Sequence, residues 1–219
     1  QADLNRKELQ NSHLVIITLV LVASVIIIWL AVTRRMHSQL KVQARTDKLT
    51  GIANRHYFTE LAHSNLRYHE RTKQSLSFVV FDLDLFKRIN DSYGHVTGDW
   101  ALQKVVATVQ QVCRGQDVIG RMGGEEFGII LPGCNLEKAL LITENYRSAI
   151  AAIDTAETGY DFTLTASFGV ADTHQCGYSF DDLYASADQA LYRSKDEGRN
   201  QVYGFEPDFL SDTLTEQPV

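Results

Sequence analysis

Two adjacent glycines, Gly123 and Gly124, set the strongest constraint on how this chain can fold. They separate two apolar runs, residues 117–119 and residues 127–131. This spacing predicts a β-hairpin with a two-residue turn, in which both glycines can adopt positive φ at no steric cost. Because the tip carries no side chains, a phosphate or a ribose could approach its backbone closely.

Acidic residues accompany this turn and also end an upstream strand. Glu125 and Glu126 follow the glycines, and strand alternation would send them to opposite faces; taken alone, they also suit an exposed, solvated hairpin. Residues 77–81 are apolar on both faces, as in a buried central strand, and end in Asp82. A carboxylate there is costly unless it is paired or binds a metal. With a hairpin carboxylate it forms an oxygen site suited to Mg²⁺, and Lys87 offers a charge for phosphate.

Five ordered motifs resemble those of the GGDEF family of diguanylate cyclases, in the GGEEF spelling, and they cover about residues 46–205. The resemblance implies an α/β fold related to nucleotidyl cyclase and polymerase palm domains, with a mixed five-stranded sheet flanked by helices. The motifs lie at residues 47–55 (D-x-L-T-G-x-x-N-R), 81–99 (F-D-x-D-x-F-K-x-I-N-D, then G-H-x-x-G-D), 123–127 (G-G-E-E-F), 167–171 and 187–200.

The resemblance also implies a reaction: two GTP molecules condense to cyclic di-GMP and two pyrophosphates, with one GTP bound by each domain of a homodimer. By this resemblance Asp82, the carbonyl of Leu83 and Glu125 hold Mg²⁺, two ions per site, with Mn²⁺ as an alternative. Glu125 accepts the 3′-hydroxyl proton, Lys87 is counted with it as catalytic, and the role of Glu126 stays open. The residues expected to bind substrate are Lys87, Asn90, His95, Asp99, Gly123, Gly124, Lys195 and Arg199.

Simpler interpretations remain open for some of these residues. Asp99 would accept the paired N1–H and N2–H₂ donors of guanine, but it could also cap a helix that begins at Trp100. Lys195 and Arg199 would share one helix face if the helix continued to Gly198, and they could also form a solvated basic helix end.

Arg114 and Asp117 match the family's R-x-x-D inhibitory site for cyclic di-GMP, which makes the product a feedback inhibitor. Guanidinium groups suit phosphates and stack on guanine. The alternative is a turn with an exposed ion pair. A formal net charge of −6 argues against a nucleic-acid partner.

Residues 14–32 form an uncharged run that would span roughly 28 Å as a helix, enough to cross a membrane, with a buried core helix as the alternative. Arg34 and Arg35 follow it, and positive charges are more frequent after the run than before, which predicts a cytoplasmic C-terminal side. We therefore expect a single-pass protein of the bacterial inner membrane. The chain begins at Gln1, so we expect a fragment whose sensory part preceded it. The expected organisation is an extracytoplasmic remnant (1–13), a transmembrane helix (14–32), a juxtamembrane helical or plain linker (33–46), the catalytic domain (47–205) and a flexible tail (206–219).

Apolar periodicity and capping residues predict the elements of the catalytic domain, with Asn135 and Ser179 as the caps of two of its helices. Isolated cysteines suit a reducing compartment. The alternative functions are a catalytically silent GGDEF module that senses GTP or cyclic di-GMP, and a cyclase for another nucleotide, which Asp99 disfavours. The expected helices are 54–71, 100–113, 135–153 and 179–198, and the expected strands are 78–82, 117–122, 125–131, 163–171 and 201–205.

Overall fold

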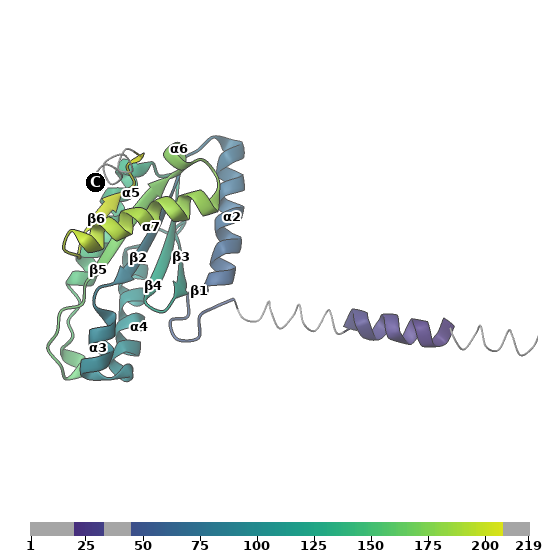
Figure 1. Ribbon diagram of the computed structural model, residues 1–219, viewed down its shortest axis with the longest axis horizontal. Coiled ribbons are helices and arrows are strands. Elements are labelled where there is room, and N and C mark those ends of the chain that lie inside the picture. Colours follow the sequence, from purple (N-terminus) through teal and green to yellow (C-terminus); the bar gives the residue numbers. More distant parts are fainter. Residues whose placement is uncertain (1–19, 33–44, 208–219) are drawn as a thin grey trace, which may run out of the picture. The chain divides into compact units, whose positions relative to one another are not determined.

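The computed structural model describes residues 20–32 and 45–207 of a chain that divides into two units, Gln1–Arg45 and Thr46–Val219. In the first unit residues 20–32 are helical, and all of them except Ser24 are exposed (Figure 1). Among the described residues, no helix is both long enough and apolar enough to cross a membrane. The predicted span at 14–32 begins outside the described residues. The predicted remnant at 1–13 and most of the predicted linker (33–46) and tail (206–219) also lie outside them.

In the second unit the described strands form one six-stranded sheet in the order β1-β3-β4-β2-β5-β6. β2 lies at its centre, antiparallel to both β4 and β5, whereas the outer pairs β1–β3 and β5–β6 are parallel. The expected count of five was one too low, because two-residue β1 is too short to leave a pattern in the sequence. The strands are β1 (Ala53–Asn54), β2 (Leu76–Leu83), β3 (Val118–Gly123), β4 (Glu126–Pro132), β5 (Ala166–Asp172) and β6 (Val202–Gly204).

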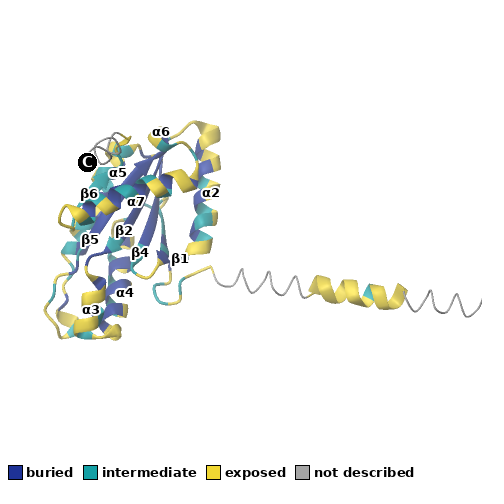
Figure 2. Cartoon of the chain, in the orientation of Figure 1, coloured by how far each residue is buried: buried dark blue, intermediate teal, exposed yellow. Residues whose placement is uncertain are grey.

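Helices cover both faces of this sheet, and the central strands are buried between them (Figures 1 and 2). Val79 and Phe81 of β2 pack in the cluster that includes residues of α4 and α5, while Phe78 and Val80 pack in the cluster that includes α2 and α7. β2 is therefore apolar on both faces, as predicted. The helices are α2 (Arg55–Thr72), α3 (Phe86–Tyr93), α4 (His95–Val112), α5 (Leu136–Ala151), α6 (Thr173–Cys176) and α7 (Phe180–Asp196), with a 3₁₀ turn at Ala156–Thr158.

Two helices approach the sheet closely where it carries glycine. Gly120 and Gly128 lie opposite each other on β3 and β4, and the ring of Phe58 from α2 rests over both; a Cβ added at Gly128 would lie 2.8 Å from that ring. At Gly169 on β5 an added Cβ would fall within 3.0 Å of the backbone of α7, at the Ala187 carbonyl oxygen. The backbone of α7 therefore lies directly against β5.

Predicted helix caps are confirmed at Asn135 and Ser179, whose side chains accept from backbone amides of the first turns of α5 and α7. Two of the predicted boundaries that the structure corrects concern predicted site residues. α4 begins at His95, because Gly94 at φ 83° redirects the chain straight from α3 into α4. Asp99 consequently lies inside α4 and caps no helix at Trp100.

The second wrong boundary is the end of α7, which stops at Asp196 and not at Gly198. Arg199 and Asn200 adopt left-handed conformations there, with φ of 65° and 49°. Lys195 and Arg199 therefore do not share a helix face.

Candidate active site

The end of β2 and the start of β4 bring two carboxylates together. Asp82 and Glu126 are directly paired in the antiparallel ladder, and the amide of Leu83 donates to the carbonyl of Glu125 at 3.3 Å. Directly opposed residues project their side chains from the same face of a sheet. Asp82 and Glu126 therefore lie side by side on the face that α7 covers.

The hairpin turn lies one residue later than predicted. Gly124 and Glu125 form it, with Gly123 paired to Glu126 and a bulge between Arg121 and Gly123. Both glycines have positive φ, 156° and 51°, in agreement with the prediction. Glu125 therefore lies in the turn and not in the strand, while Glu126 is the first residue of β4.

Arg121 stabilises this turn through side-chain hydrogen bonds. Its Nε and Nη2 atoms donate to the carbonyl oxygen of Gly124 at 3.0 and 2.7 Å, and its Nη1 atom donates to Asp47 at 2.9 Å. The same oxygen of Asp47 accepts from the amide and the hydroxyl of Thr50. The first motif of the domain is thus tied to the hairpin tip, a role that the sequence analysis did not assign to it.

The electrostatics of the site centre on Asp82, whose side chain is 19% exposed. Burial raises the pKa of Asp82 to about 6; nearby Lys195 opposes this shift, while Glu125 and Glu126 add to it. The Nζ atom of Lys195, on α7, lies 3.1 Å from Oδ1 of Asp82. Lys195, expected at the triphosphate, is thus brought to the carboxylates and partly neutralises them.

Tyr184 is a residue of this site that the sequence analysis missed. Its hydroxyl donates to Oε1 of Glu126 at 2.6 Å, and burial, followed by this carboxylate, raises the pKa of Tyr184. Tyr184 and Lys195 are eleven residues apart on α7, close to three whole turns, so they lie on one face of the helix. That spacing was the available signal.

The donor set at the end of β2 fits a hard divalent cation. Within residues 20–32 and 45–207 no group of three or more His, Cys, Asp or Glu side chains is arranged to hold a metal. Mg²⁺, however, commonly takes one or two carboxylates and fills its remaining positions with phosphate oxygens and water. Asp82 and Glu126 supply such a pair, and a cation between them would compensate the burial, and the smaller effect of Glu125 and Glu126, that raise the pKa of Asp82.

The other expected substrate residues lie on α3, α4 and the turn after α7. Lys87, His95 and Asp99 are exposed. The side-chain amide of Asn90, on α3, packs against Gly98 of α4, where an added Cβ would collide with it. The structure thus brings Asn90 next to the turn of α4 that carries Asp99.

Arg114 and Asp117 bind each other. The Nε atom of Arg114 donates to Oδ1 of Asp117 at 3.0 Å, and the backbone amide of Arg114 and the hydroxyl of Tyr146 also donate to this carboxylate. The side chain of Asp117 is completely buried, whereas that of Arg114 is 29% exposed. The ion pair is therefore largely buried, and not exposed as the simpler alternative expected.

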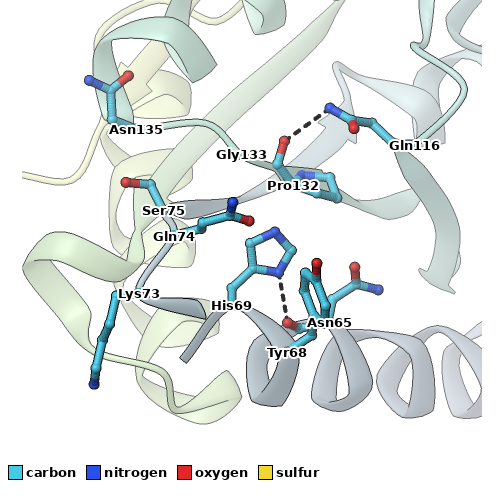
Figure 3. Close-up of a pocket in the computed structure, with 10 residues that line it drawn as sticks. All are labelled: Asn65, Tyr68, His69, Lys73, Gln74, Ser75, Gln116, Pro132, Gly133 and Asn135. Atoms are coloured by element: carbon cyan, nitrogen blue, oxygen red, sulfur yellow. Dashed lines mark hydrogen bonds between the residues drawn. The ribbon is translucent and has the colours of Figure 1, made fainter. Parts of the chain in front are cut away.

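A cavity of about 850 Å³ lies at the opposite end of β2 from Asp82 (Figure 3). It is remote from the paired carboxylates, because six residues of extended strand cover about 20 Å. The Nε2 atom of Gln116 donates to the Pro132 carbonyl at its rim, so the cavity adjoins the turn that carries Arg114 (Figure 3). Its lining is mostly polar: Asn65, Tyr68, His69, Lys73, Gln74, Ser75, Gln116, Pro132, Gly133 and Asn135.

Comparison with known proteins gives a consistent result. A family model described as "Diguanylate cyclase, GGDEF domain" matches residues 44–201. Diguanylate cyclase DgcM of Escherichia coli is 37% identical over 169 residues, which are 77% of this chain and 40% of that protein. Diguanylate cyclase DgcS of Shewanella oneidensis is 34% identical over 80% of this chain and 57% of its own length. The chain thus spans well under two thirds of these relatives.

Solved structures agree. The GGDEF domain of DgcB from Caulobacter crescentus, in complex with c-di-GMP, is 32% identical and superposes with a TM-score of 0.69 over 74% of this chain and 95% of that one. The active GGEEF domain of a diguanylate cyclase from Vibrio cholerae is 30% identical, with a TM-score of 0.66 over 71% of this chain and 98% of that one.

Proposed function

This chain belongs to the GGDEF family of diguanylate cyclases, and we propose that it condenses two GTP molecules to cyclic di-GMP and two pyrophosphates. The observation that carries the proposal is the pairing of Asp82 with Glu126 beside a turn that presents bare glycine backbone, with Lys195 reaching the same carboxylates. Each domain offers one such site, so making a product from two nucleotides calls for two domains facing each other.

The roles of the residues follow from where they lie. Asp82, the carbonyl of Leu83 and Glu125 would hold Mg²⁺ or Mn²⁺, two ions per site, and Glu126 is placed to join them because it lies beside Asp82. When bound, the metal neutralises the triphosphate and lowers the pKa of the attacking 3′-hydroxyl. Glu125, in the turn, accepts the proton of that hydroxyl.

Positive side chains hold the triphosphate. Lys195, which lies at Asp82 in this structure, would bind a phosphate if a cation occupied the carboxylate, and Lys87 and Arg199 would add further charge. At the other end of the nucleotide, Asn90 and Asp99 accept the donors of the guanine edge, with His95 in the same stretch. The glycines at 123 and 124 leave room for the substrate beside the turn.

We also propose that the product inhibits the enzyme through Arg114. In support, the partly exposed guanidinium is fixed by Asp117, and the cavity described above begins at the neighbouring Gln116. Arg114→Ala should relieve inhibition by cyclic di-GMP and leave the initial rate unchanged, as measured by product formation with and without added cyclic di-GMP. Inhibition of the same strength in this variant would contradict the assignment.

Residues 14–32 are proposed to anchor the protein in the bacterial inner membrane as a single span, with the catalytic domain in the cytoplasm and a homodimer brought together at the membrane. The uncharged run and the arginines after it support this placement. Fractionation of cells, with protease access to each side of the membrane, tests it; recovery in the soluble fraction would count against the anchor.

The purified chain incubated with GTP and Mg²⁺, with chromatography of the products, tests the activity. We expect cyclic di-GMP and pyrophosphate, and loss of both in Glu125→Gln and in Glu126→Gln. Asp172→Asn serves as a matched control, because it alters a carboxylate at the far end of the sheet. Tight GTP binding without any product would instead favour the silent sensing module.

A further inference from the structure

Asp84 has a buried carboxylate that the reaction as described does not use. Its residue is 7% exposed, and burying a carboxylate is costly unless hydrogen bonds satisfy it. Oδ1 accepts from the hydroxyl of Ser167 at 2.6 Å, and Oδ2 accepts from the hydroxyl of Thr165 at 2.8 Å and from the backbone amide of Asn200 at 3.0 Å. The amide of Asp84 itself donates to the carbonyl of Thr165 at 2.9 Å. One carboxylate thus joins three segments: the end of β2, the beginning of β5 and the turn after α7.

The turn that Asp84 holds is strained. Arg199 and Asn200 are consecutive non-glycine residues with left-handed φ, a conformation that asparagine tolerates better than arginine does. Such a conformation persists only where the surroundings hold it in place. Asp84 binds the amide of Asn200, and the Nη1 atom of Arg147 on α5 donates to the side-chain oxygen of Asn200 at 2.8 Å. The amide of Arg199 donates to the carbonyl of Ser194 at 3.0 Å.

We infer that Asp84 is a positioning residue. It fixes the left-handed turn so that Arg199 is held toward the triphosphate of a nucleotide whose metal lies at Asp82. The inference rests on the proposed function, since it assumes that a nucleotide triphosphate binds here. Asp82 lies in β2, which ends at Leu83, and Asp84 follows directly in the turn. The distance from the paired carboxylates to the backbone of the turn is therefore set by the hydrogen bond from Asn200 to Asp84, and not by the flexible side chains of the turn.

Asp172 provides a matched control in the same sheet. It is 3% exposed, and its carboxylate accepts from the backbone amides of Leu136 and Gln175, both at 3.1 Å. It pairs with Ser77 near the start of β2, the opposite end from Asp84. Asp172→Asn therefore removes a buried charge of the same kind without touching the turn after α7.

The test measures two affinities for each variant of the whole chain. A fluorescent, non-hydrolysable GTP analogue with Mg²⁺ reports binding that includes the phosphates, and displacement by guanosine reports binding of the base and ribose alone. Asp84→Asn should weaken the GTP analogue by about tenfold, the lower end of what removing a supporting residue costs, and leave guanosine unchanged. Asp172→Asn should lower the melting temperature and change neither affinity.

A second variant decides the matter if Asp84→Asn does not fold. Thr165→Val removes the hydroxyl that donates to Oδ2 of Asp84, the same oxygen that accepts from the amide of Asn200, so it loosens this anchor and should weaken the GTP analogue selectively as well. Unchanged affinity for the analogue in both variants, or an equal loss for the analogue and guanosine, would overturn the inference. Failure of the unmodified chain to bind the GTP analogue would refute the proposed function itself, and the inference with it.

Discussion

Tyr184→Phe removes one oxygen from the candidate site and should raise the Mg²⁺ requirement of the enzyme about tenfold. The hydroxyl donates to Glu126 at 2.6 Å, a short hydrogen bond to a charged acceptor, and such bonds contribute about 1.5–3 kcal/mol. Glu126 is only partly buried, so water can replace the lost donor and the lower value applies. About 1.5 kcal/mol corresponds to a tenfold change in an equilibrium constant.

The assay is the rate of cyclic di-GMP formation as a function of Mg²⁺ concentration, together with metal binding by calorimetry in the presence of a non-hydrolysable GTP analogue. Tyr146→Phe is the matched control, because that hydroxyl also donates to an aspartate, Asp117, but away from the paired carboxylates. The control should lose stability and keep its Mg²⁺ dependence. An unchanged Mg²⁺ dependence in Tyr184→Phe, or the same shift in both variants, would refute the idea that Tyr184 orients Glu126 for the metal.

Two further perturbations have outcomes fixed by the packing and by charge. Gly169→Ala should lower the free energy of unfolding by about 3 kcal/mol, the upper end for overpacking, because the new methyl meets the backbone of α7; Gly128→Ala should cost less, because it meets the ring of Phe58. Urea unfolding measures both, and equal costs would contradict this. The raised pKa of Asp82 means that its protonated form contributes stability that is fully present below about pH 4 and is lost as the pH rises through about 6. Metal-free Asp82→Asn should therefore exceed the unmodified chain in stability by on the order of 3 kcal/mol at pH 8 and by little at pH 4, and a pH-independent difference would count against the shift.

The sheet could be predicted from the sequence wherever apolar pattern and turn residues agreed. β2 is apolar on both faces, and the glycines at 123 and 124 mark the hairpin, so β2, β3 and β4 were expected close to their observed positions. The end of α7 could not be predicted, because residues that favour a helix continue in the sequence up to Gly198, whereas the helix ends at Asp196. Hydrogen bonds from the turn to Asp84 and Arg147, both distant in sequence, hold that exit.

In the candidate site, too, residues in local motifs could be predicted and residues with partners distant in sequence could not. Asp82, the hairpin glutamates and Lys195 belong to local motifs, and the structure brings them to the same end of the sheet, although Lys195 was expected at the triphosphate and lies at Asp82. Tyr184 and Asp84 escaped notice because their partners lie 58 and 116 residues away along the chain. The spacing of Tyr184 and Lys195 places both on one face of α7, but no local pattern marks the partners Glu126 and Asn200, which the fold alone brings within hydrogen-bonding distance.

The close packing of α7 against Gly169 fixes the position of that helix on the sheet. Tyr184 and Lys195 leave it about 16 Å apart along its axis, yet they reach inward to neighbouring carboxylates on adjacent strands. With no side chain between helix and strand at Gly169, α7 cannot slide or roll without colliding with the sheet. Any adjustment to a bound nucleotide must then come from rotation of the Tyr184 and Lys195 side chains, while the backbone of α7 stays in place.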